Sequence, residues 1–378
     1  MLVAVPAETQ ADESRVAASP ETVRKFIALG ATVRVQSGAG LASGIPDADF
    51  EAAGAGIAGD AAAALADADI VLKVRRPEAA EIALLKKGAI VIGTLDPYGH
   101  DDAVKALADA GIVAFATELT PRITRAQVMD VLSSQANLAG YRAVIDGAAE
   151  YGRALPMMMT AAGTVPAARV FVMGAGVAGL QAIATARRLG AIVTATDVRP
   201  AAKEQVESLG AKFIAVEDEE FKQAETAGGY AREMSDAYKQ KQADLVAAHI
   251  AKQDIVITTA LIPGRPAPRL VSDAMVRSMR PGSVIVDLAV ERGGNVEGAQ
   301  PGAVAVVDGV KIVGHLNVPG RLAATASALY AKNLLAFAEQ LIDKEKKTIA
   351  VDWDDEIVKA TALTRDGAVI HPAFQPKG

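Results

Sequence analysis

The segment from residue 169 to residue 197 contains the pattern that most limits what this chain can fold into. A run of four apolar residues ends at Gly174, and Gly176 and Gly179 follow in the spacing Gly-x-Gly-x-x-Gly. A tight turn needs the first glycine, a closely approaching ligand needs the second, and a helix packed closely on its strand needs the third. A second strand-like run ends at Asp197. Together these features predict a βαβ unit that binds the pyrophosphate of a dinucleotide.

The residues after the glycines indicate which dinucleotide binds. A helix that begins near Val177 points its free N–H groups and the positive end of its dipole at the phosphates. The carboxylate of Asp197 accepts hydrogen bonds from ribose hydroxyls and repels a 2′-phosphate, which favours NAD(H) over NADP(H) as cofactor. Arg199 can pair with such a phosphate, but beside Asp197 we interpret it as a solvated strand-end residue or one that flanks the adenine.

Composition excludes several other classes of function. The chain has 378 residues, 51% of them apolar, which is enough for two domains with large cores. A net charge of -6, with no basic cluster larger than residues 344–347, argues against nucleic acid as the main partner. The absence of cysteine excludes thiol chemistry and fits a reducing compartment, and the 4 histidines are too scattered to predict a metal site.

No targeting or membrane-spanning segment is expected in this sequence. Residues 1–6 resemble a strand and lack the charged leader and the long apolar core of a signal peptide. The uncharged stretch from residue 170 to residue 186 contains three glycines and a glutamine, and the nucleotide fold explains it.

Strand-like and helix-like segments alternate along the chain, which predicts an α/β protein with two doubly wound, parallel-sheet, Rossmann-like domains. In the first half, we expect strands at residues 3–5, 32–35, 70–74, 89–92 and 113–116, and helices at residues 20–29, 61–66, 78–85 and 101–110. Around the glycines, we expect strands at residues 170–173, 192–196, 212–216, 254–259, 283–288 and 311–314.

The central position of the glycine pattern predicts an inserted nucleotide domain. We expect one long helix over residues 125–155 to lead into it and a helix over residues 323–341 to lead away. The predicted domains are therefore residues 1–136 with 322–378, and an NAD(H)-binding domain over residues 137–321. The remaining tail, residues 348–378, contains a strand-like run at residues 349–353 and is expected to return to the first domain.

A polar pattern after residue 121 leaves two interpretations open. Gln127, Asp130, Ser133 or Ser134, and Asn137 recur at helical spacing, and Arg122 precedes them. They can form an ordinary solvent-exposed helix face, with their apolar neighbours pointing into the core. Alternatively, the amide and carboxylate can grip a nicotinamide carboxamide while the arginine meets a phosphate or a partner's cofactor.

Two further segments can approach a ligand. The charged region at residues 217–242 contains Gly228-Gly229-Tyr230, which is typical of a lid with Tyr230 as its cover, or of a glycine turn before a surface helix at residues 232–249. Residues 258–268 follow a buried strand at its carboxyl end, so the backbone of Ala260 and Leu261 can touch ribose or nicotinamide, unless the prolines only stiffen a loop.

Taken together, five segments resemble the NAD(H)-binding component of proton-translocating nicotinamide nucleotide transhydrogenase over essentially the whole chain. They are residues 13–17, 73–77, 122–130, 157–169 and 228–234. The resemblance implies that the chain docks on a membrane-spanning unit at the inner face of the cell membrane and faces an NADP(H)-binding component. Hydride then passes directly between the two nicotinamides while a proton crosses the membrane. A homodimer is expected from the family alone.

The resemblance also assigns roles to residues. It implies a nicotinamide loop of Arg122, Gln127, Asp130 and Ser133, with Tyr230 closing over it. These residues act by positioning rings and excluding water, because hydride transfer needs no acid, base or nucleophile from the protein. Expected contacts with the rest of NAD(H) are Arg125, Gly174, Gly176, Val177, Gly179, Asp197, Val198, Arg199, Gly229, Gln242, Ala260 and Leu261.

Two other functions remain as alternatives. Alanine dehydrogenase shares the fold, and its lysine matches Lys73, but where its histidine should follow the strand this chain has residues 93–96, Gly-Thr-Leu-Asp. Its aspartate before a Gly-Gly pair is Glu291 here. Without the histidine, pyruvate lacks its acid partner, which argues against that chemistry and leaves Arg15 and Lys73 as relics that stabilise the first domain. The other alternative is a regulatory NAD-binding subunit without a reaction of its own.

Overall fold

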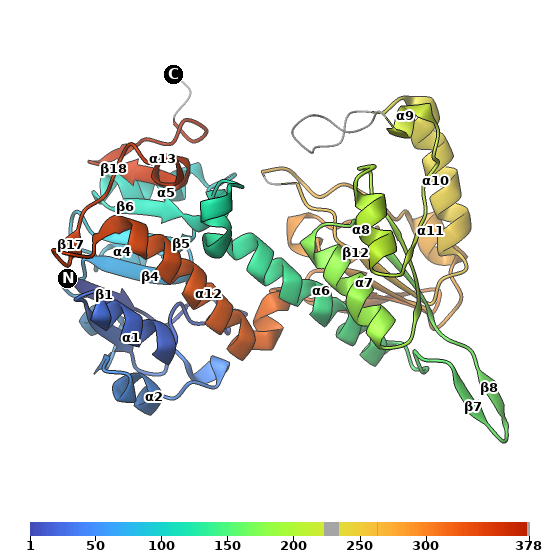
Figure 1. Cartoon of the computed structure of the whole chain (residues 1–378), viewed down its shortest axis with the longest axis horizontal. Helices are drawn as coiled ribbons and strands as arrows, with labels where there is room; N and C mark the ends of the chain where they lie inside the picture. The colour runs from blue at the N-terminus through green and yellow to red at the C-terminus, as the bar shows by residue number, and fades with distance from the viewer. Residues whose placement is uncertain (223–233, 263, 376–378) are drawn as a thin grey trace. The chain divides into compact units, whose positions relative to one another are not determined.

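The computed structural model describes residues 1–222, 234–262 and 264–375 and divides the chain into two compact units. Unit 1 is Met1–Gln135 with Gly320–Gly378, and unit 2 is Ala136–Pro319. Each unit is a mostly parallel sheet with helices on both faces (Figure 1). The predicted fold class is therefore confirmed. Among the described helices, none has the length and apolar character needed to cross a membrane.

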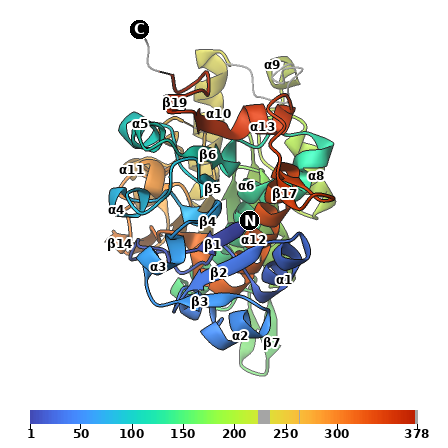
Figure 2. The same cartoon turned by 90° about the vertical axis from the view of Figure 1, so that its left-hand side faces the viewer.

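The sheet of unit 1 has eight strands in the order β19-β18-β6-β5-β4-β1-β2-β3, which Figure 2 shows from β6 to β3. All neighbouring pairs are parallel except those of β18, which runs antiparallel to both β6 and β19. In chain order the strands are β1 (Leu2–Val5), β2 (Thr32–Gln36), β3 (Gly56–Ala58), β4 (Ile70–Arg75), β5 (Ile90–Thr94), β6 (Val113–Ala116), β18 (Ala362–Arg365) and β19 (Ala368–Val369).

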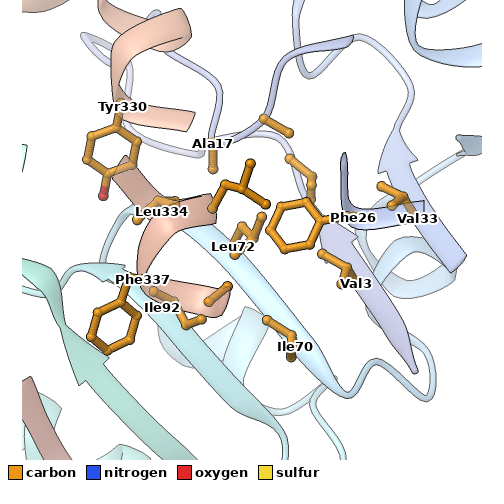
Figure 3. Close-up of a cluster of buried hydrophobic side chains, with 14 of the residues drawn as sticks. Val3, Ala17, Phe26, Val33, Ile70, Leu72, Ile92, Tyr330, Leu334 and Phe337 are labelled. Atoms are coloured by element: carbon orange, nitrogen blue, oxygen red, sulfur yellow. The ribbon is translucent and has the colours of Figure 1, made fainter. Parts of the chain in front are cut away.

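Alternate residues of these strands feed two separate cores. Ile70 and Leu72 of β4 point to one core, and Val71 points to the other. Phe26 and Leu334 meet the first of these faces (Figure 3). Burial on both faces is what a parallel sheet between two helix layers requires. The first face is covered by α1 (Pro20–Ala28), α2 (Asp47–Ala52), α12 (Ala323–Ala338) and α13 (Glu356–Thr361), and the second by α3 (Ala61–Leu65), α4 (Ala79–Ile82) and α5 (Asp101–Asp109).

The sheet of unit 2 has seven strands in the order β11-β10-β9-β12-β13-β15-β14, and only β14 and β15 pair antiparallel. Because the chain passes from β9 to β10 on one side and later to β12 on the other, the carboxyl ends of β9 and β12 form the switch point where such sheets bind ligands. The strands are β9 (Arg169–Met173), β10 (Ile192–Thr196), β11 (Lys212–Phe213), β12 (Ile255–Thr258), β13 (Val284–Asp287), β14 (Val304–Val307) and β15 (Val310–Val313).

Helices again cover both faces of this sheet. On one face lie α6 (Val131–Glu150), α7 (Val177–Arg188) and α8 (Ala202–Ser208), and on the other lie α10 (Asp236–Ile250) and α11 (Asp273–Ser278). The α6 helix packs so closely on α7 that a Cβ on Gly140 would lie 2.0 Å from the carbonyl oxygen of Ala178. A short α9 (Glu219–Lys222) and a β-hairpin of β7 (Met158–Thr160) and β8 (Gly163–Val165) complete the unit.

The prediction of one long helix over residues 125–155 is wrong. A 3-10 helix, η3 (Thr124–Met129), ends at Asp130, and α6 begins at the next residue. The carboxylate of Asp130 accepts hydrogen bonds from the backbone N–H of Ser133 at 2.9 Å and from its hydroxyl at 2.5 Å. An aspartate that bonds the backbone three residues ahead starts a new helix, so Gln127 and Asp130 do not share one helix face.

The expected strand at residues 349–353 is also largely absent. Only Thr348–Ile349 forms a strand, β17, which pairs with β16 (Ile342–Asp343). Trp353 instead packs its ring against Phe115 at 6.0 Å between centroids, under the guanidinium of Arg365 at 4.1 Å. Ile349, Val351 and Trp353 are therefore partly buried by side-chain packing against the core of unit 1, and β18 makes the return to its sheet.

Candidate functional site

Three glycines shape the turn between β9 and α7. Gly174 has a φ of +105°, a backbone conformation that suits glycine, and a Cβ there would lie 2.5 Å from the Thr259 hydroxyl. A Cβ on Gly179 would lie only 1.8 Å from the carbonyl oxygen of Gly174. Beside Gly176, by contrast, a Cβ would meet nothing within 4 Å. The first and third glycines serve internal packing, and the second faces open space at the start of α7, which is the room that a pyrophosphate requires.

Thr259 fastens this turn to the end of β12. Its backbone N–H donates to the carbonyl oxygen of Met173 at 2.9 Å, and its hydroxyl donates to that of Gly174 at 3.1 Å. The turn is therefore held from a strand that lies 85 residues further along the chain. The sequence prediction missed Thr259, and the only signal for it was its place just before Ala260 at the end of a strand.

Asp197 lies at the end of β10 with its side chain 7% exposed. One carboxylate oxygen accepts the backbone N–H of Ala175 at 2.7 Å, and both oxygens accept from the guanidinium of Arg199 at 2.9 and 3.0 Å. Burial raises the pKa of Asp197, but hydrogen bonds from Arg199 and from the backbone N–H groups outweigh it and hold that pKa below its usual value. Arg199 is therefore held by Asp197 instead of extending into solvent, while the neighbouring Val198 is 65% exposed.

Gln242 lies on α10 and braces the region beside Asp197. Its side-chain oxygen accepts the backbone N–H of Val216 at 2.9 Å, and its side-chain nitrogen donates to the hydroxyl of Thr196 at 3.3 Å. Both ends of the amide are thus engaged by the protein. Gly229 and Tyr230, which were predicted to belong to a lid, lie outside the described residues.

Asn295 holds both ends of the segment that follows β12. Its side chain is fully buried, accepts the backbone N–H of Ala260 at 3.1 Å and donates to the carbonyl oxygens of Ala260 at 2.9 Å and Pro268 at 2.8 Å. Both backbone groups of Ala260 are therefore used inside the protein, whereas Leu261 is 52% exposed. The sequence prediction missed Asn295, although it follows a glycine pair at 293–294 with φ values of 92° and 78°, a sign of a constrained turn.

The polar residues predicted to meet a nicotinamide all belong to unit 1. The structure brings Asp130 and Ser133 together at the start of α6 and leaves Arg122 and Gln127 exposed. Arg125, which was predicted to contact the cofactor, lies 2.8 Å from Asp355 and 3.2 Å from Glu356 at the start of α13.

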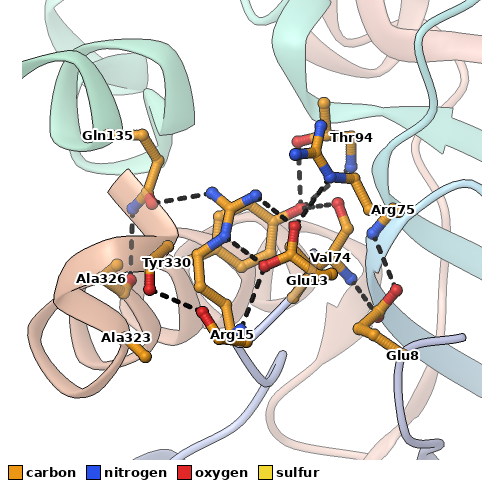
Figure 4. Close-up of polar contacts among 12 residues, drawn as sticks. Glu8, Glu13, Arg15, Val74, Arg75, Thr94, Gln135, Ala323, Ala326 and Tyr330 are labelled. Atoms are coloured by element: carbon orange, nitrogen blue, oxygen red, sulfur yellow. Dashed lines mark hydrogen bonds and ion pairs between the residues drawn. The ribbon is translucent and has the colours of Figure 1, made fainter. Parts of the chain in front are cut away.

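Unit 1 also contains a cluster of buried ionic side chains (Figure 4). Nε and Nη2 of Arg15 each donate to the carboxylate of Glu13 at 2.7 Å, and Nε of Arg75 donates to it at 2.7 Å. Burial raises the pKa of Glu13, but the hydrogen bonds and charge of Arg15, and then the charge of Arg75, lower it to about 2. The remaining Nη1 of Arg15 donates to the side-chain oxygen of Gln135 at 2.9 Å.

Lys73 lies on β4 and has no exposed surface. Its ammonium group is 2.7 Å from Glu81 and 3.3 Å from Glu8. On the neighbouring strand β5, the backbone N–H of Thr94 donates to the hydroxyl of Tyr330 at 2.9 Å. Among the described residues, no group of three or more His, Asp or Glu side chains is arranged to hold a metal ion.

Comparison with known proteins gives matches along the whole chain. Residues 4–139 match the N-terminal domain, and residues 143–372 the C-terminal domain, of the alanine dehydrogenase/PNT family. The sequence is 58% identical over 383 residues to the first part of NAD(P) transhydrogenase subunit alpha of Rhodospirillum rubrum, with 100% of both chains covered. The crystal structure of transhydrogenase from Sinorhizobium meliloti superposes with a TM-score of 0.90 at 64% identity, covering 98% of this chain and 100% of that one. Alanine dehydrogenase of Halomonas elongata is 33% identical over 382 residues, covering 99% of this chain and 95% of its own.

Proposed function

The chain belongs to the alanine dehydrogenase/PNT family, and from this premise we propose that it is the NAD(H)-binding alpha subunit of a proton-translocating NAD(P) transhydrogenase. The choice within the family rests on degree of likeness. Identity is 58% and 64% with two transhydrogenase chains, each covered over its full length, and 33% with alanine dehydrogenase.

The observation that carries the proposal is the unequal crowding of the three fingerprint glycines. Gly174 and Gly179 have no room for a side chain because the protein itself packs there, whereas Gly176 faces open space in front of α7. A ligand with a pyrophosphate explains why that position also lacks a side chain. The ionised carboxylate of Asp197, at the end of the next strand, suits the ribose hydroxyls of NAD(H).

When bound, NADH supplies a hydride from its nicotinamide ring, which we propose is passed directly to NADP⁺ held by a partner component. The protein then has to orient the ring and exclude water. Arg122, Gln127, Asp130 and Ser133 are proposed for this role. The exposed amide of Gln127 can both donate to and accept from a carboxamide, and the carboxylate of Asp130 is held in one orientation by Ser133. Tyr230 is proposed to close over the ring.

Unit 1 also offers an argument against alanine dehydrogenase chemistry. Lys73 is completely buried and paired with two glutamates, so it offers no exposed group to a 2-oxo acid. At the end of β5, where a histidine would be needed as the acid partner, Thr94 bonds Tyr330 instead.

Transhydrogenation with proton coupling requires other chains. We propose that an NADP(H)-binding component and a membrane-spanning component complete the enzyme, and that this chain sits peripherally on the inner face of the cell membrane. The Rhodospirillum rubrum relative is by name only the first part of a subunit alpha, which supports a division of the enzyme among several chains.

We further propose that two copies of this chain pair through the β7–β8 hairpin. Almost every residue of the hairpin is exposed, including Met158 at 42% and Met159 at 79%, and an isolated two-stranded hairpin is at best marginally stable. A shallow, mainly apolar pocket of about 510 Å³ lies at its base, lined by Leu155, Pro156 and Leu189 among others, with Arg188 as its charged residue. A hairpin and a pocket on one surface suit a two-fold pair in which each copy supplies both.

Sedimentation velocity tests this pairing. We expect Met159→Lys to convert the dimer to a monomer, because the ammonium group would lose its hydration in a mainly apolar pocket and would be repelled by Arg188 in the pocket lining. Val306→Lys, which places the same charge on a different exposed apolar residue (63% exposed), serves as the control and should leave the dimer intact. A monomeric wild-type protein, or a dimeric Met159→Lys variant, would contradict the proposed interface.

Reconstitution tests the activity. This chain, mixed with an NADP(H)-binding component, should transfer hydride from NADH to NADP⁺. We expect Gln127→Asn or Asp130→Asn to slow that transfer far more than it weakens NADH binding, because these residues orient the ring. Gln240→Asn, a change in an exposed glutamine of α10, is the control. The same protein with NADH, pyruvate and ammonia tests alanine dehydrogenase activity, and success there without hydride transfer to NADP⁺ would overturn the proposal.

A further inference from the structure

Asn333 lies on α12, is 8% exposed and bridges the junction between η3 and α6. Its side-chain nitrogen donates to the carbonyl oxygen of Val128 at 2.8 Å, and its side-chain oxygen accepts the hydroxyl of Ser134 at 2.7 Å. Val128 directly follows Gln127, and Ser134 lies one turn into α6 beyond Asp130. One buried amide therefore holds the backbone on one side of Asp130 and a side chain on the other.

The junction has few other constraints on its outer side. The side chain of Val128 is 64% exposed, so packing of that side chain does not fix the peptide group between Val128 and Met129. The neighbouring Ala126 and Met129 are buried at 1% and 3% exposure and anchor only the inner side of η3. The hydrogen bond from Asn333 is thus the tertiary contact that sets how the carbonyl of Val128 points, and with it the direction in which Gln127 leaves the core.

The donor and acceptor ends of the Asn333 amide are fixed by its own partner Val128, and the hydrogen bonds of the buried ionic cluster agree with that assignment. Arg15 can only donate, so the oxygen of Gln135 faces it and the nitrogen of Gln135 faces the carbonyl oxygen of Ala326 at 3.2 Å (Figure 4). The same nitrogen also donates to the hydroxyl of Ser134 at 3.3 Å. Ser134 accepts from Gln135 and donates to the oxygen of Asn333. The nitrogen of Asn333 is then left to donate to Val128, which has a carbonyl oxygen that can only accept.

We propose that Asn333 is a positioning residue for hydride transfer, which acts by fixing the backbone between Gln127 and Asp130 through its hydrogen bonds to Val128 and Ser134. The inference rests on the proposed function of Gln127 and Asp130.

Asn333→Asp is the decisive variant. It keeps the size of the side chain and the acceptor for Ser134, but replaces the donor to Val128 with an oxygen that repels the carbonyl. We expect the single-turnover rate of hydride transfer from NADH to NADP⁺ to fall about 10- to 100-fold, because small misplacements of orienting groups cost that much. The Kd of NADH should change less than about threefold, since a lost orienting contact lowers the rate of the chemical step and leaves binding largely intact.

Lys332→Ala is the matched control. Lys332 directly precedes Asn333 on α12 and is an exposed partner of Glu21, so this variant should transfer hydride at the wild-type rate.

Combining variants separates positioning from general damage. In a Gln127→Ala background, Asn333→Asp should slow transfer by a smaller factor than in the wild-type protein, because the part of its effect that acts through Gln127 is already lost and only the part through Asp130 remains. Ser134→Ala removes the hydrogen bond to Asn333 and the one from Gln135 but keeps the Asn333 donor to Val128, so it provides a milder variant if Asn333→Asp folds poorly and should slow transfer in the same direction. A multiplicative effect in the double variant, or a lowered Tm with an unchanged transfer rate, would assign Asn333 a merely structural role.

Amide hydrogen exchange tests the geometry independently of activity. Exchange of residues 124–130 should be faster in Asn333→Asp than in the wild-type protein and unchanged in Lys332→Ala. Unchanged exchange in Asn333→Asp refutes the inference. If the wild-type protein transfers no hydride but exchange is faster in Asn333→Asp, the proposed function is refuted, while the contact by which Asn333 holds residues 124–130 in place is still supported.

Discussion

Replacing Gly179 or Gly176 with alanine should separate two uses of glycine that a sequence pattern cannot tell apart. At Gly179 the new Cβ would start 1.8 Å from the carbonyl oxygen of Gly174. An ordinary carbon–oxygen contact is about 3.3 Å, so α7 and the turn must separate by roughly 1.5 Å. At Gly176 the backbone has φ -76° and ψ -167°, which alanine accepts, and the Cβ meets no atom within 4 Å.

The expected magnitudes follow from this difference. Forced overpacking costs about 1–3 kcal/mol, and each kcal/mol lowers Tm by about 2–4 °C for a unit of this size, so Gly179→Ala should lower Tm by roughly 2–12 °C. Gly176→Ala should leave Tm within about 1 °C of the wild-type value, because nothing in the protein is displaced. If a pyrophosphate approaches that position, however, Gly176→Ala should raise the Kd of NADH at least about tenfold, which corresponds to about 1.4 kcal/mol.

Two measurements on purified protein decide the matter. Scanning calorimetry gives Tm without ligand, and isothermal titration gives the Kd of NADH. Wild-type NADH affinity in Gly176→Ala would refute the assignment of the open space beside that glycine to the pyrophosphate. An unchanged Tm in Gly179→Ala would refute the packing argument for the third glycine.

Three further changes have defined outcomes. Asp197→Asn releases Arg199 and should shift the ratio of NADH to NADPH affinity at least about tenfold toward NADPH, as measured by titration calorimetry. The pKa of Asp197 is lowered in the fold, so its ionised carboxylate stabilises the wild-type protein above about pH 4, and this stabilisation is lost as pH falls through the lowered pKa. If the free energy of unfolding in urea decreased equally at acid pH in wild type and Asp197→Asn, the ion pair would be contradicted. Burial, and to a lesser degree the charge of Asp96, raise the pKa of Glu118 to about 7, so stability should fall as pH rises from about 4.3 to about 7, and Glu118→Gln should abolish that fall between pH values of about 5 and 8. Gly140→Ala places a Cβ 2.0 Å from the carbonyl oxygen of Ala178 and should lower both Tm and NADH affinity, whereas an effect on neither would show that α6 does not support the first turn of α7.

The nucleotide-binding pattern was readable from the sequence because its physical causes are local. Gly174 and Gly179 contact each other across a single turn, and the strands on either side are apolar runs that need no knowledge of distant residues. For the same reason most strands and helices were predicted within a few residues. Strands of a sheet that is buried on both faces consist of short apolar runs, which are visible in the sequence.

Asp130 shows where that reasoning stops. Its spacing from Gln127 and Ser133 suits a continuous helix, but its carboxylate bonds the backbone of Ser133 and begins a new helix. A short polar side chain can either lie on a helix face or cap a helix, and residue spacing alone does not distinguish the two. Which one occurs depends on whether the preceding turn is held in place by other parts of the fold.

The amino-acid sequence alone was therefore enough to predict a βαβ unit of the NAD(H)-binding type, two α/β domains and the family resemblance. Tertiary structure decided which groups remain free to meet a ligand. Thr259 reaches Gly174 across 85 residues, Asn295 reaches Ala260 across 35, and Asn333 reaches Val128 across 205. Threonine and asparagine occur everywhere in loops and helices, and their donors and acceptors become specific only when packing brings a distant carbonyl or N–H group within hydrogen-bond distance.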